Sequence, residues 1–339
     1  MNRKLSLPAQ FPNRELGFLA FNRRVLAQAE DHTVPLLERL RVITMVSSNL
    51  DEYFEIRVAR LKEQMKLGLP APGSNGLAPT AVFDAVNREA HGLVAEQYHL
   101  LNQTVLPALA AEGIGFPKPE EWNPAQRQWI RDYFSREVLP VLTPIGLDAA
   151  HPFPRIFNKS LNFAVELAGR DAFGRNSGAA IVQAPRALPR VIRLPQALAG
   201  AAQYAFVFLS SILHAHMAEL FSGMSVEGCY QFRVTRNFDL FESKKLRNGL
   251  QGELLHRRFG DAVRLEVADN CSQRMVEFLL QQFSLRDADL YRVDGPVNLY
   301  RMREVPDQME RPDLKYPPFQ PGLLSAQHAG DILQVLKMQ

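Results

Sequence analysis

The residue types best suited to chemistry in this chain gather in one short stretch, Ser47-Ser48-Asn49-Leu50-Asp51-Glu52. Around it, apolar residues recur every three or four positions from Leu36 to Met65, which predicts a long helix with one apolar stripe. Ser and Asn side chains compete for backbone hydrogen bonds, so the stretch predicts either a helix break with a new N-cap or a polar face presented to a ligand. Asn49 and Glu52 have the spacing of a capping box, and the pattern alone favours the cap.

Other candidate sites are weaker. Asp51 and Glu52 are adjacent, so on a helix they diverge by about 100° and cannot work as a paired acid and base. His214 and His216 fall in a helical pattern that would place them about 200° apart, which favours a partly exposed helix face over a metal site. Residues 169–176 have the glycine spacing of a phosphate loop but carry Arg-Asn where Lys-Ser/Thr is required, so they predict a polar hairpin turn. His151, before Pro152, predicts a structural residue of a rigid turn. We therefore expect no catalytic residue and no metal ligand in this chain.

Composition bounds the class of protein. The chain has 339 residues, of which 46% are hydrophobic and 22% charged, so two ordinary globular domains are expected. The net charge of +3 comes from interspersed opposite charges, which argues against a nucleic-acid binder. Cys229 and Cys271 are isolated and predict buried thiols in a reducing compartment. No apolar run approaches the ~18 residues of a membrane span, so we expect a cytoplasmic protein, with peripheral membrane attachment left open.

Hydrophobic periodicity divides the chain in two. Helices are expected at residues 16–30, 34–67, 80–111 and 122–138, with an exposed turn at 68–76 between two antiparallel helices. Beyond residue 151 the pattern becomes mixed. It predicts strands at 161–167, 179–183, 191–194 and 230–236, and helices at 209–220, 245–258 and 272–283. Residues 161–167 alternate as a strand with one buried face should. Residues 297–303 close this region, and a Pro-rich linker spans 311–321. The expected fold class is multidomain α and α+β, with an all-helical N-terminal domain followed by an α+β head.

Several segments of the chain are recognisable. The stretch Ser48-Asn49-Leu50-Asp51-Glu52-Tyr53-Phe54 and the stretch His151-Pro152-Phe153-Pro154-Arg155 resemble segments of bacterial polyphosphate kinase. Further colinear blocks that resemble the same family lie at 13–16, 21–26, 35–41, 57–59, 158–163, 230–237, 258–266, 291–299 and 311–319. One departure is Gly17-Phe18, where the family usually has Ser-Trp, which puts local packing in question because glycine weakens a helix by ~1 kcal/mol relative to alanine.

The resemblance implies a division into a tail (1–12), a helical N-terminal domain (13–115), an α+β head that forms dimers (116–310) and a linker with the start of a catalytic domain (311–339). Family members are about twice as long, and their catalytic half carries two phospholipase-D-like domains and a phosphorylated histidine. In the family, a segment like 330–333 leads into a His-His-Pro-Tyr stretch, whereas this sequence ends at Gln339. This departure suggests truncation or a frame disruption, and we expect the 339-residue chain alone to be inactive.

The resemblance also assigns roles. It implies an enzyme that transfers the terminal phosphate of ATP reversibly to polyphosphate, with Mg²⁺ held by the catalytic domains and with a homodimer or higher homo-oligomer formed through the head. Asn49 occupies the position of an asparagine that contributes to ATP binding in the family. Its carboxamide can match an adenine edge or a ribose group without ionising. Ser47, Ser48 and Asp51 are expected to shape that face, and Arg57 to pair within the helix. The alternative is a non-catalytic, dimerising interaction module produced by truncation.

Overall fold

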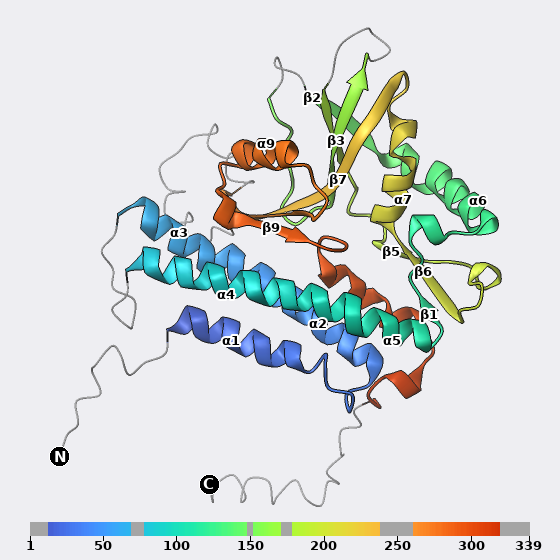
Figure 1. Ribbon diagram of the computed structural model, residues 1–339, viewed down its shortest axis with the longest axis horizontal. Coiled ribbons are helices and arrows are strands. Elements are labelled where there is room, and N and C mark those ends of the chain that lie inside the picture. Colours follow the sequence, from blue (N-terminus) through green and yellow to red (C-terminus); the bar gives the residue numbers. More distant parts are fainter. Residues whose placement is uncertain (1–12, 69–77, 148–151, 171–177, 238–259, 319–339) are drawn as a thin grey trace, which may run out of the picture.

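A computed structural model describes residues 13–68, 78–147, 152–170, 178–237 and 260–318. It shows a layer of long helices against which a mixed α and β head packs (Figure 1). Helix α1 spans Arg14–Ala27, and its N-cap residue Asn13 accepts hydrogen bonds from the backbone N–H groups of Glu15 and Leu16 at 2.9 and 3.2 Å. Outside the described residues lie the predicted helix at 245–258, His151, residues 171–176 of the hairpin turn predicted at 169–176, and residues 69–76 of the exposed turn predicted at 68–76.

The second predicted helix is continuous. It consists of α2 (Leu36–Glu52), a π-helical segment (Tyr53–Val58) and α3 (Ala59–Lys66). The predicted break with an N-cap at Asn49 is wrong, because the Tyr53 N–H donates to the Asn49 carbonyl within an unbroken helix. The capping-box spacing was misleading because the Asn49 side chain has a partner on another helix.

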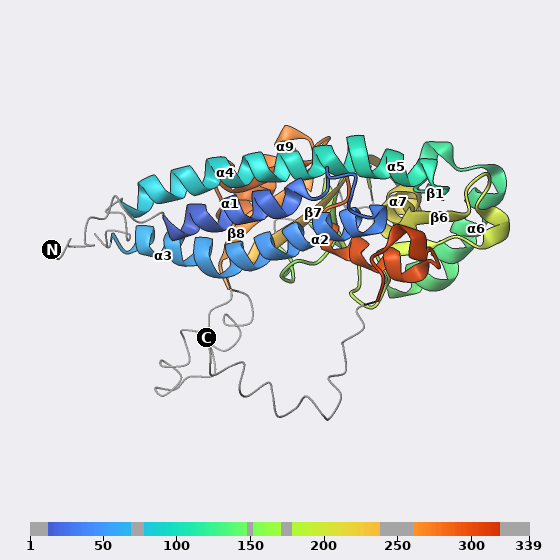
Figure 2. The same ribbon diagram turned by 90° about the horizontal axis from the view of Figure 1, so that it is seen from below.

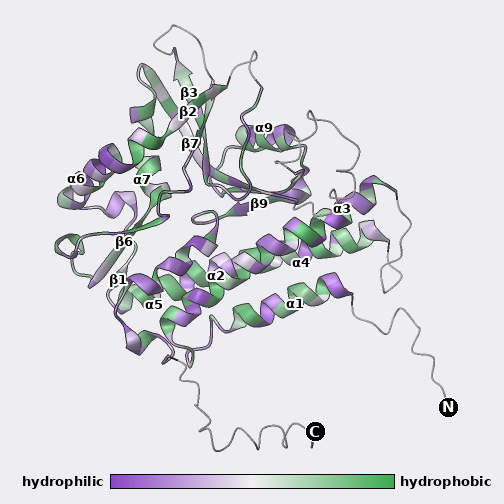
Figure 3. Ribbon diagram, turned by 180° about the vertical axis from the view of Figure 1, so that it is seen from behind, coloured by the Kyte–Doolittle hydropathy of each residue, from purple (hydrophilic) through white to green (hydrophobic). Residues whose placement is uncertain are grey.

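The third predicted helix is confirmed as α4 (Pro79–Leu100), a π-helical segment (Leu101–Val105) and α5 (Leu106–Ala111). It runs antiparallel to α2 and α3, and α1 lies alongside both (Figures 1 and 2). Hydrophilic and hydrophobic residues alternate along these helices in Figure 3, as expected for helices with one buried stripe. Among the described residues, no helix has the length and apolar character needed to cross a membrane.

The head contains two sheets. The larger has the strand order β2 (Thr143–Leu147), β4 (Ala179–Gln183), β3 (Asn162–Gly169), β7 (Met224–Arg236), β8 (Ala262–Ala268) and β9 (Leu290–Val293). Strands β8 and β9 are parallel, and the other pairs are antiparallel. The smaller sheet has the order β1 (Ile114–Gly115), β6 (Tyr204–Phe208) and β5 (Val191–Arg193).

The helices of the head are α6 (Pro124–Tyr133), which continues as a π-helical segment (Phe134–Val138), α7 (Leu209–His216) and α9 (Gln273–Phe283). A 3₁₀ segment, Leu299–Glu304, follows β9. The predicted strands at β3, β4, β5 and β7 and the predicted helices at α6, α7 and α9 are therefore present, and the α plus α+β fold class is confirmed. Strands β1, β2, β6, β8 and β9 were not predicted.

The larger sheet is covered on both faces. Ala164, Ile181 and Phe232 pack with α9 on one face, whereas Phe163 and Val165 join the apolar core that continues into the helical layer. The prediction that β3 buries only one face is wrong, because the helical layer covers the side that an isolated two-layer domain would expose to water.

Candidate functional site

Asn49 lies half-buried on α2 with its carboxamide tethered at one end. Its Nδ2 donates to Oδ1 of Asn22 on α1 at 2.8 Å, and Asn22, fully buried, donates in turn to the carbonyl of Phe18 at 2.9 Å. The second bond fixes the Asn22 amide, and the first then fixes the Asn49 amide. Within the described residues, Asn49 Oδ1 has no hydrogen-bond partner, so the carboxamide presents an acceptor and one remaining N–H.

Two large apolar side chains are exposed on the helices that carry Asn49 and Asn22. Met45, one turn earlier on α2, is 51% exposed, and Phe21, adjacent to Asn22, is 47% exposed. Arg24 lies over the Phe21 ring at 5.9 Å. A tethered amide beside exposed apolar side chains suits a ligand or a protein surface that covers the face.

Asp51 points to the opposite side of α2, into the interface with the head. Its Oδ2 accepts from Arg233 Nη1 at 2.9 Å and its Oδ1 accepts from Arg264 Nη2 at 2.5 Å. Glu266 completes the cluster, because its Oε2 lies 3.1 Å from Arg264 Nη2 and also contacts Arg233 Nε. All four residues are buried. Two carboxylates and two guanidinium groups therefore neutralise one another between α2, β7 and β8.

The electrostatics of this cluster favour its charged form. Burial alone would raise the pKa of Asp51, but the charges of Arg233 and Arg264 outweigh burial and hold that pKa below its ordinary value. Arg264 also stacks over the Phe54 ring at 4.4 Å. The ion cluster fixes the rotation of α2 against the head, and this rotation places Asn49 on the outer side.

The other predicted site residues divide between these two faces. Ser47 is buried one turn before Asp51, and Ser48 is half-buried beside Asn49. The prediction that Arg57 pairs within its own helix is wrong. Arg57 forms an ion pair with Glu15 of α1 at 3.3 Å. The reason is that Arg57 follows the start of the π-helical segment and stacks over Phe18 of α1, at 5.4 Å.

The structure also identifies residues that sequence reasoning missed. Asn22, Arg233 and Arg264 have no local signal of a role, because their partners lie between 27 and 213 positions away. The only available signal was a charged residue amid apolar neighbours on a strand, as in Val263-Arg264-Leu265. That pattern more often indicates a solvent-facing strand.

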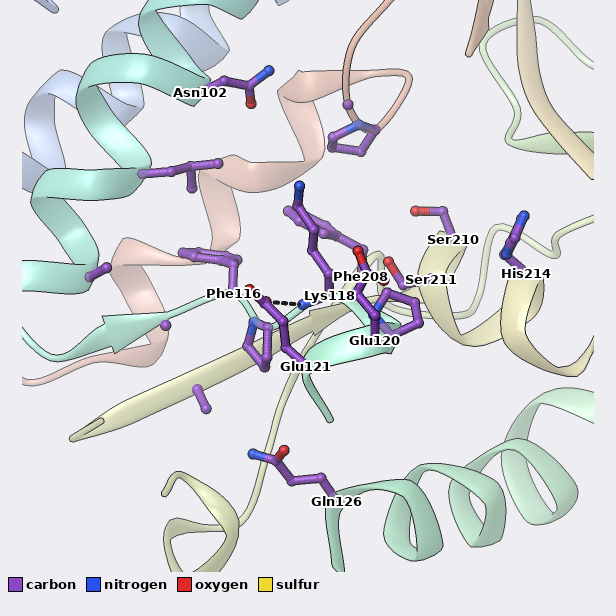
Figure 4. A pocket seen from close by; sticks show the side chains of 18 of the residues that line it. Asn102, Phe116, Lys118, Glu120, Glu121, Gln126, Phe208, Ser210, Ser211 and His214 are labelled. Carbon is purple, nitrogen blue, oxygen red and sulfur yellow. Dashed lines mark hydrogen bonds between the residues drawn. The ribbon is translucent and has the colours of Figure 1, made fainter. Parts of the chain in front are cut away.

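A separate pocket of about 920 Å³ lies between the helical layer and the head. Figure 4 shows Asn102 on one side and Ser210, Ser211 and His214 of α7 on another, with Lys118 and Glu121 between them. The Lys118 backbone N–H donates to Glu121 at 2.7 Å. In the described part of the chain, neither serine is hydrogen-bonded to His214, so the pocket shows no assembled nucleophile and base. Asn49 does not line it.

The remaining candidate side chains are hydrogen-bonded, stacked or buried within the fold. His216 is hydrogen-bonded to Glu219 at 2.7 Å and stacks on Phe134. Across residues 13–68, 78–147, 152–170, 178–237 and 260–318, no group of three or more His, Cys, Asp or Glu side chains could hold a metal ion. Cys229 and Cys271 are free and buried, which confirms the predicted burial of the two thiols, and burial raises the pKa of each thiol to about 12.

Comparisons with known proteins agree with the two-part fold. Residues 11–116 match the family model described as the polyphosphate kinase N-terminal domain, and residues 125–305 match the polyphosphate kinase middle domain. The chain is 58% identical over 317 residues to a polyphosphate kinase of Neisseria gonorrhoeae, covering 92% of this chain and 46% of the relative. It is 53% identical over 343 residues to one of Burkholderia vietnamiensis, covering 96% of this chain and 50% of the relative.

A solved structure supports the same architecture. The crystal structure of polyphosphate kinase from Porphyromonas gingivalis superposes with a TM-score of 0.74 at 22% identity, covering 92% of this chain and 43% of that one. The fold therefore defines a helical domain joined to an α+β head of the polyphosphate kinase type. With both family models matched, the chain belongs to the polyphosphate kinase family. It spans about half the length of the curated relatives it matches.

Proposed function

We propose that this chain is the part of a polyphosphate kinase that supplies one wall of the ATP site, through Asn49 on the outer face of α2. The observation that carries the proposal is the tethered carboxamide: Asn49 is held by Asn22 at 2.8 Å while its Oδ1 has no partner among the described residues. An acceptor held in one orientation fits a neutral donor such as the adenine amino group or a ribose hydroxyl. Preorganisation of this kind lowers the entropy lost on binding.

The rest of the reaction is assigned to the half that relatives have and this chain does not cover. In the complete enzyme, the terminal phosphate of ATP passes reversibly to polyphosphate. We assign the Mg²⁺ ligands to that half as well. In this chain the buried carboxylates of Asp51 and Glu266 are already paired with arginines. We assign self-association to the head. The two free, buried cysteines support a reducing, cytoplasmic setting.

The test is Asn49→Ala in a complete polyphosphate kinase whose first half is this chain. Loss of one neutral hydrogen bond to the nucleotide should raise the apparent Michaelis constant for ATP about two- to tenfold. The constant for polyphosphate should stay unchanged. Asn49→Ser should behave like the alanine variant, because a hydroxyl on a shorter side chain cannot replace a carboxamide held by Asn22.

A matched control is Asn87→Ala, which removes a neutral side-chain bond of 3.2 Å between α4 and Tyr291. This variant should lose comparable stability but keep the wild-type dependence on ATP. Steady-state kinetics and denaturant unfolding on all three variants separate binding from folding. Normal ATP dependence in both Asn49 variants would show that Asn49 does not read the nucleotide.

A further inference from the structure

The pocket of about 920 Å³ between the helical layer and the head has a floor of apolar side chains. Phe116 stacks on Phe206 and Phe208 of β6, with ring centroids 5.5 and 5.6 Å apart. The buried side chains of Phe163 and Cys229 line the pocket from β3 and β7. Sites for small molecules usually have volumes of about 300–1,000 Å³ and linings rich in aromatic side chains. The pocket therefore has the size and the apolar surface of such a site.

One wall of this pocket, the loop at residues 294–296, is held from two sides. Asn102 Nδ2, from the helical layer, donates to the Asp294 carbonyl at 2.7 Å. Gln231 Nε2, from β7, donates to the Gly295 carbonyl at 2.9 Å. Both parts of the molecule thus fix the wall before any ligand arrives. A preformed site of this kind loses less conformational entropy on binding.

The charged part of the lining is mainly acidic. Glu120, Glu121 and Asp294 line the pocket together with one lysine, Lys118, and Figure 4 shows Lys118 and both glutamates. Glu121 accepts a hydrogen bond from the Lys118 backbone N–H at 2.7 Å. In the part of the chain that the structure describes, none of the three carboxylates has an ion-pair partner. A lining with this excess of acidic side chains attracts a cation and repels an anionic nucleotide or phosphate chain.

We propose that this pocket binds a small organic cation, an amine carried on an aromatic ring. The ring packs against Phe116 and Phe208, and the ammonium group is attracted by the three carboxylates. The faces of the aromatic rings favour a cation as well. The site lies where the helical layer meets the head, so the bound amine stabilises the joined arrangement of the two parts. Asn49 does not line this pocket, and the proposal is independent of the role proposed for Asn49.

The experiment is isothermal titration of the 339-residue chain with tryptamine, indole-3-acetamide and indole-3-acetate, which share one ring and differ in charge. Tryptamine should bind with a Kd at or below about 1 mM, and indole-3-acetate should bind most weakly. The double variant Glu120→Gln/Asp294→Asn should weaken tryptamine about fivefold or more and leave indole-3-acetamide within about twofold. The matched control, Asp132→Asn/Glu137→Gln, replaces two exposed carboxylates of the head outside the pocket and should leave tryptamine within about twofold.

Preferred binding of tryptamine that only the pocket variant weakens supports the proposal. Equal affinity for the three indoles, equal weakening by the control variant, or no binding of tryptamine at millimolar concentration would overturn it. Displacement of tryptamine by ATP without divalent cations would overturn it too, because a nucleotide would then occupy the pocket. All four replaced side chains are exposed and tolerate replacement, and melting temperatures without ligand check folding. Asn49→Ala should leave tryptamine binding unchanged, so this test can fail while the proposed function stands.

Discussion

Asn49 and Asp51 are two positions apart on α2, yet they serve opposite faces. Asn49 is tethered to Asn22 on the outer side, and Asp51 is buried against Arg233 and Arg264 of the head. Residues two apart on a helix diverge by about 200°, so one short motif can fix both an interface and a ligand face. The sequence pointed to the stretch, but its spacing could not show which side chain faces which way.

The buried ion cluster makes a prediction about Asp51. Asp51→Asn should lower the free energy of unfolding by about 3–5 kcal/mol at neutral pH, because it leaves two buried guanidinium groups without one of their two carboxylate partners. The exposed residue Asp84 provides the control, since Asp84→Asn should change stability by less than about 0.5 kcal/mol. Urea unfolding of both variants measures the difference, and equal effects would contradict the assignment.

The same residue predicts a pH dependence. The folded pKa of Asp51 lies below its ordinary value, so its stabilisation is complete above the unfolded pKa of about 3.9 and is lost as the pH falls through the folded pKa. The unfolding free energy of the wild type should therefore fall with acidification below about pH 4 more steeply than that of Asp51→Asn. Parallel curves for the two proteins would show that Asp51 does not titrate with this shift.

Gly17 carries a prediction of the opposite sign. It is exposed in the interior of α1, and an added Cβ would meet no atom within 4 Å. Gly17→Ala should therefore stabilise the protein by about 0.5–1 kcal/mol, and the reverse change at the exposed Ala20 should destabilise it by a similar amount. Thermal unfolding checks both. The neighbouring Phe18 stacks on Tyr53 with centroids 5.0 Å apart, so the departure from the family pattern leaves this helix packed.

At the scale of elements, the sequence predicted the helices well because their apolar stripes repeat over many turns. The partner of the Asn49 side chain could not be predicted, since Asn22 lies 27 positions earlier on another helix. Strand β8 was not predicted from the sequence for a similar reason. Its inward-facing Arg264 and Glu266 resemble a solvent face, and the cluster that neutralises them includes Asp51, 213 positions from Arg264. Local patterns report burial only when the buried side chains are apolar.

The π-helical segment Tyr53–Val58 carries side chains that contact both the head and α1. Within it, Glu55 pairs with Lys159 of the head at 2.9 Å, and Arg57 pairs with Glu15 of α1. Widened turns of this kind are frequent at functional sites. This one begins four residues after Asn49 and directs neighbouring side chains to different parts of the molecule.

At the scale of the whole molecule, many contacts join the helical layer to the head. Lys62 pairs with Asp289 at 2.7 Å, the Tyr98 hydroxyl donates to the Pro296 carbonyl at 2.9 Å, and His91 stacks on Tyr291. Together with the Asp51 cluster, these contacts lead us to expect that the two parts unfold together. We therefore expect the helix that carries Asn49 to move together with the head as one rigid body.

Self-association is a prediction for the whole chain. We expect a particle of twice 38.3 kDa at micromolar concentration, because the head is assigned to dimerisation and its surface exposes Leu139 and Val141 near the edge strand β2. Light scattering coupled to gel filtration measures the mass directly. A strict monomer across the concentration range would count against the assignment of the head.

The central claim is that this chain contributes nucleotide binding but no phosphoryl transfer of its own. The most direct measurement is polyphosphate synthesis from Mg-ATP and a polyphosphate primer by the 339-residue chain, beside the same chain fused to the second half of a close relative. We predict no chain growth above a heat-treated control for the first protein, because the pocket of its described residues shows no assembled nucleophile to carry the phosphoryl group. We predict growth for the fusion, with an ATP dependence that Asn49→Ala weakens. Growth by the 339-residue chain alone would contradict the account, and so would a folded fusion that makes no polyphosphate.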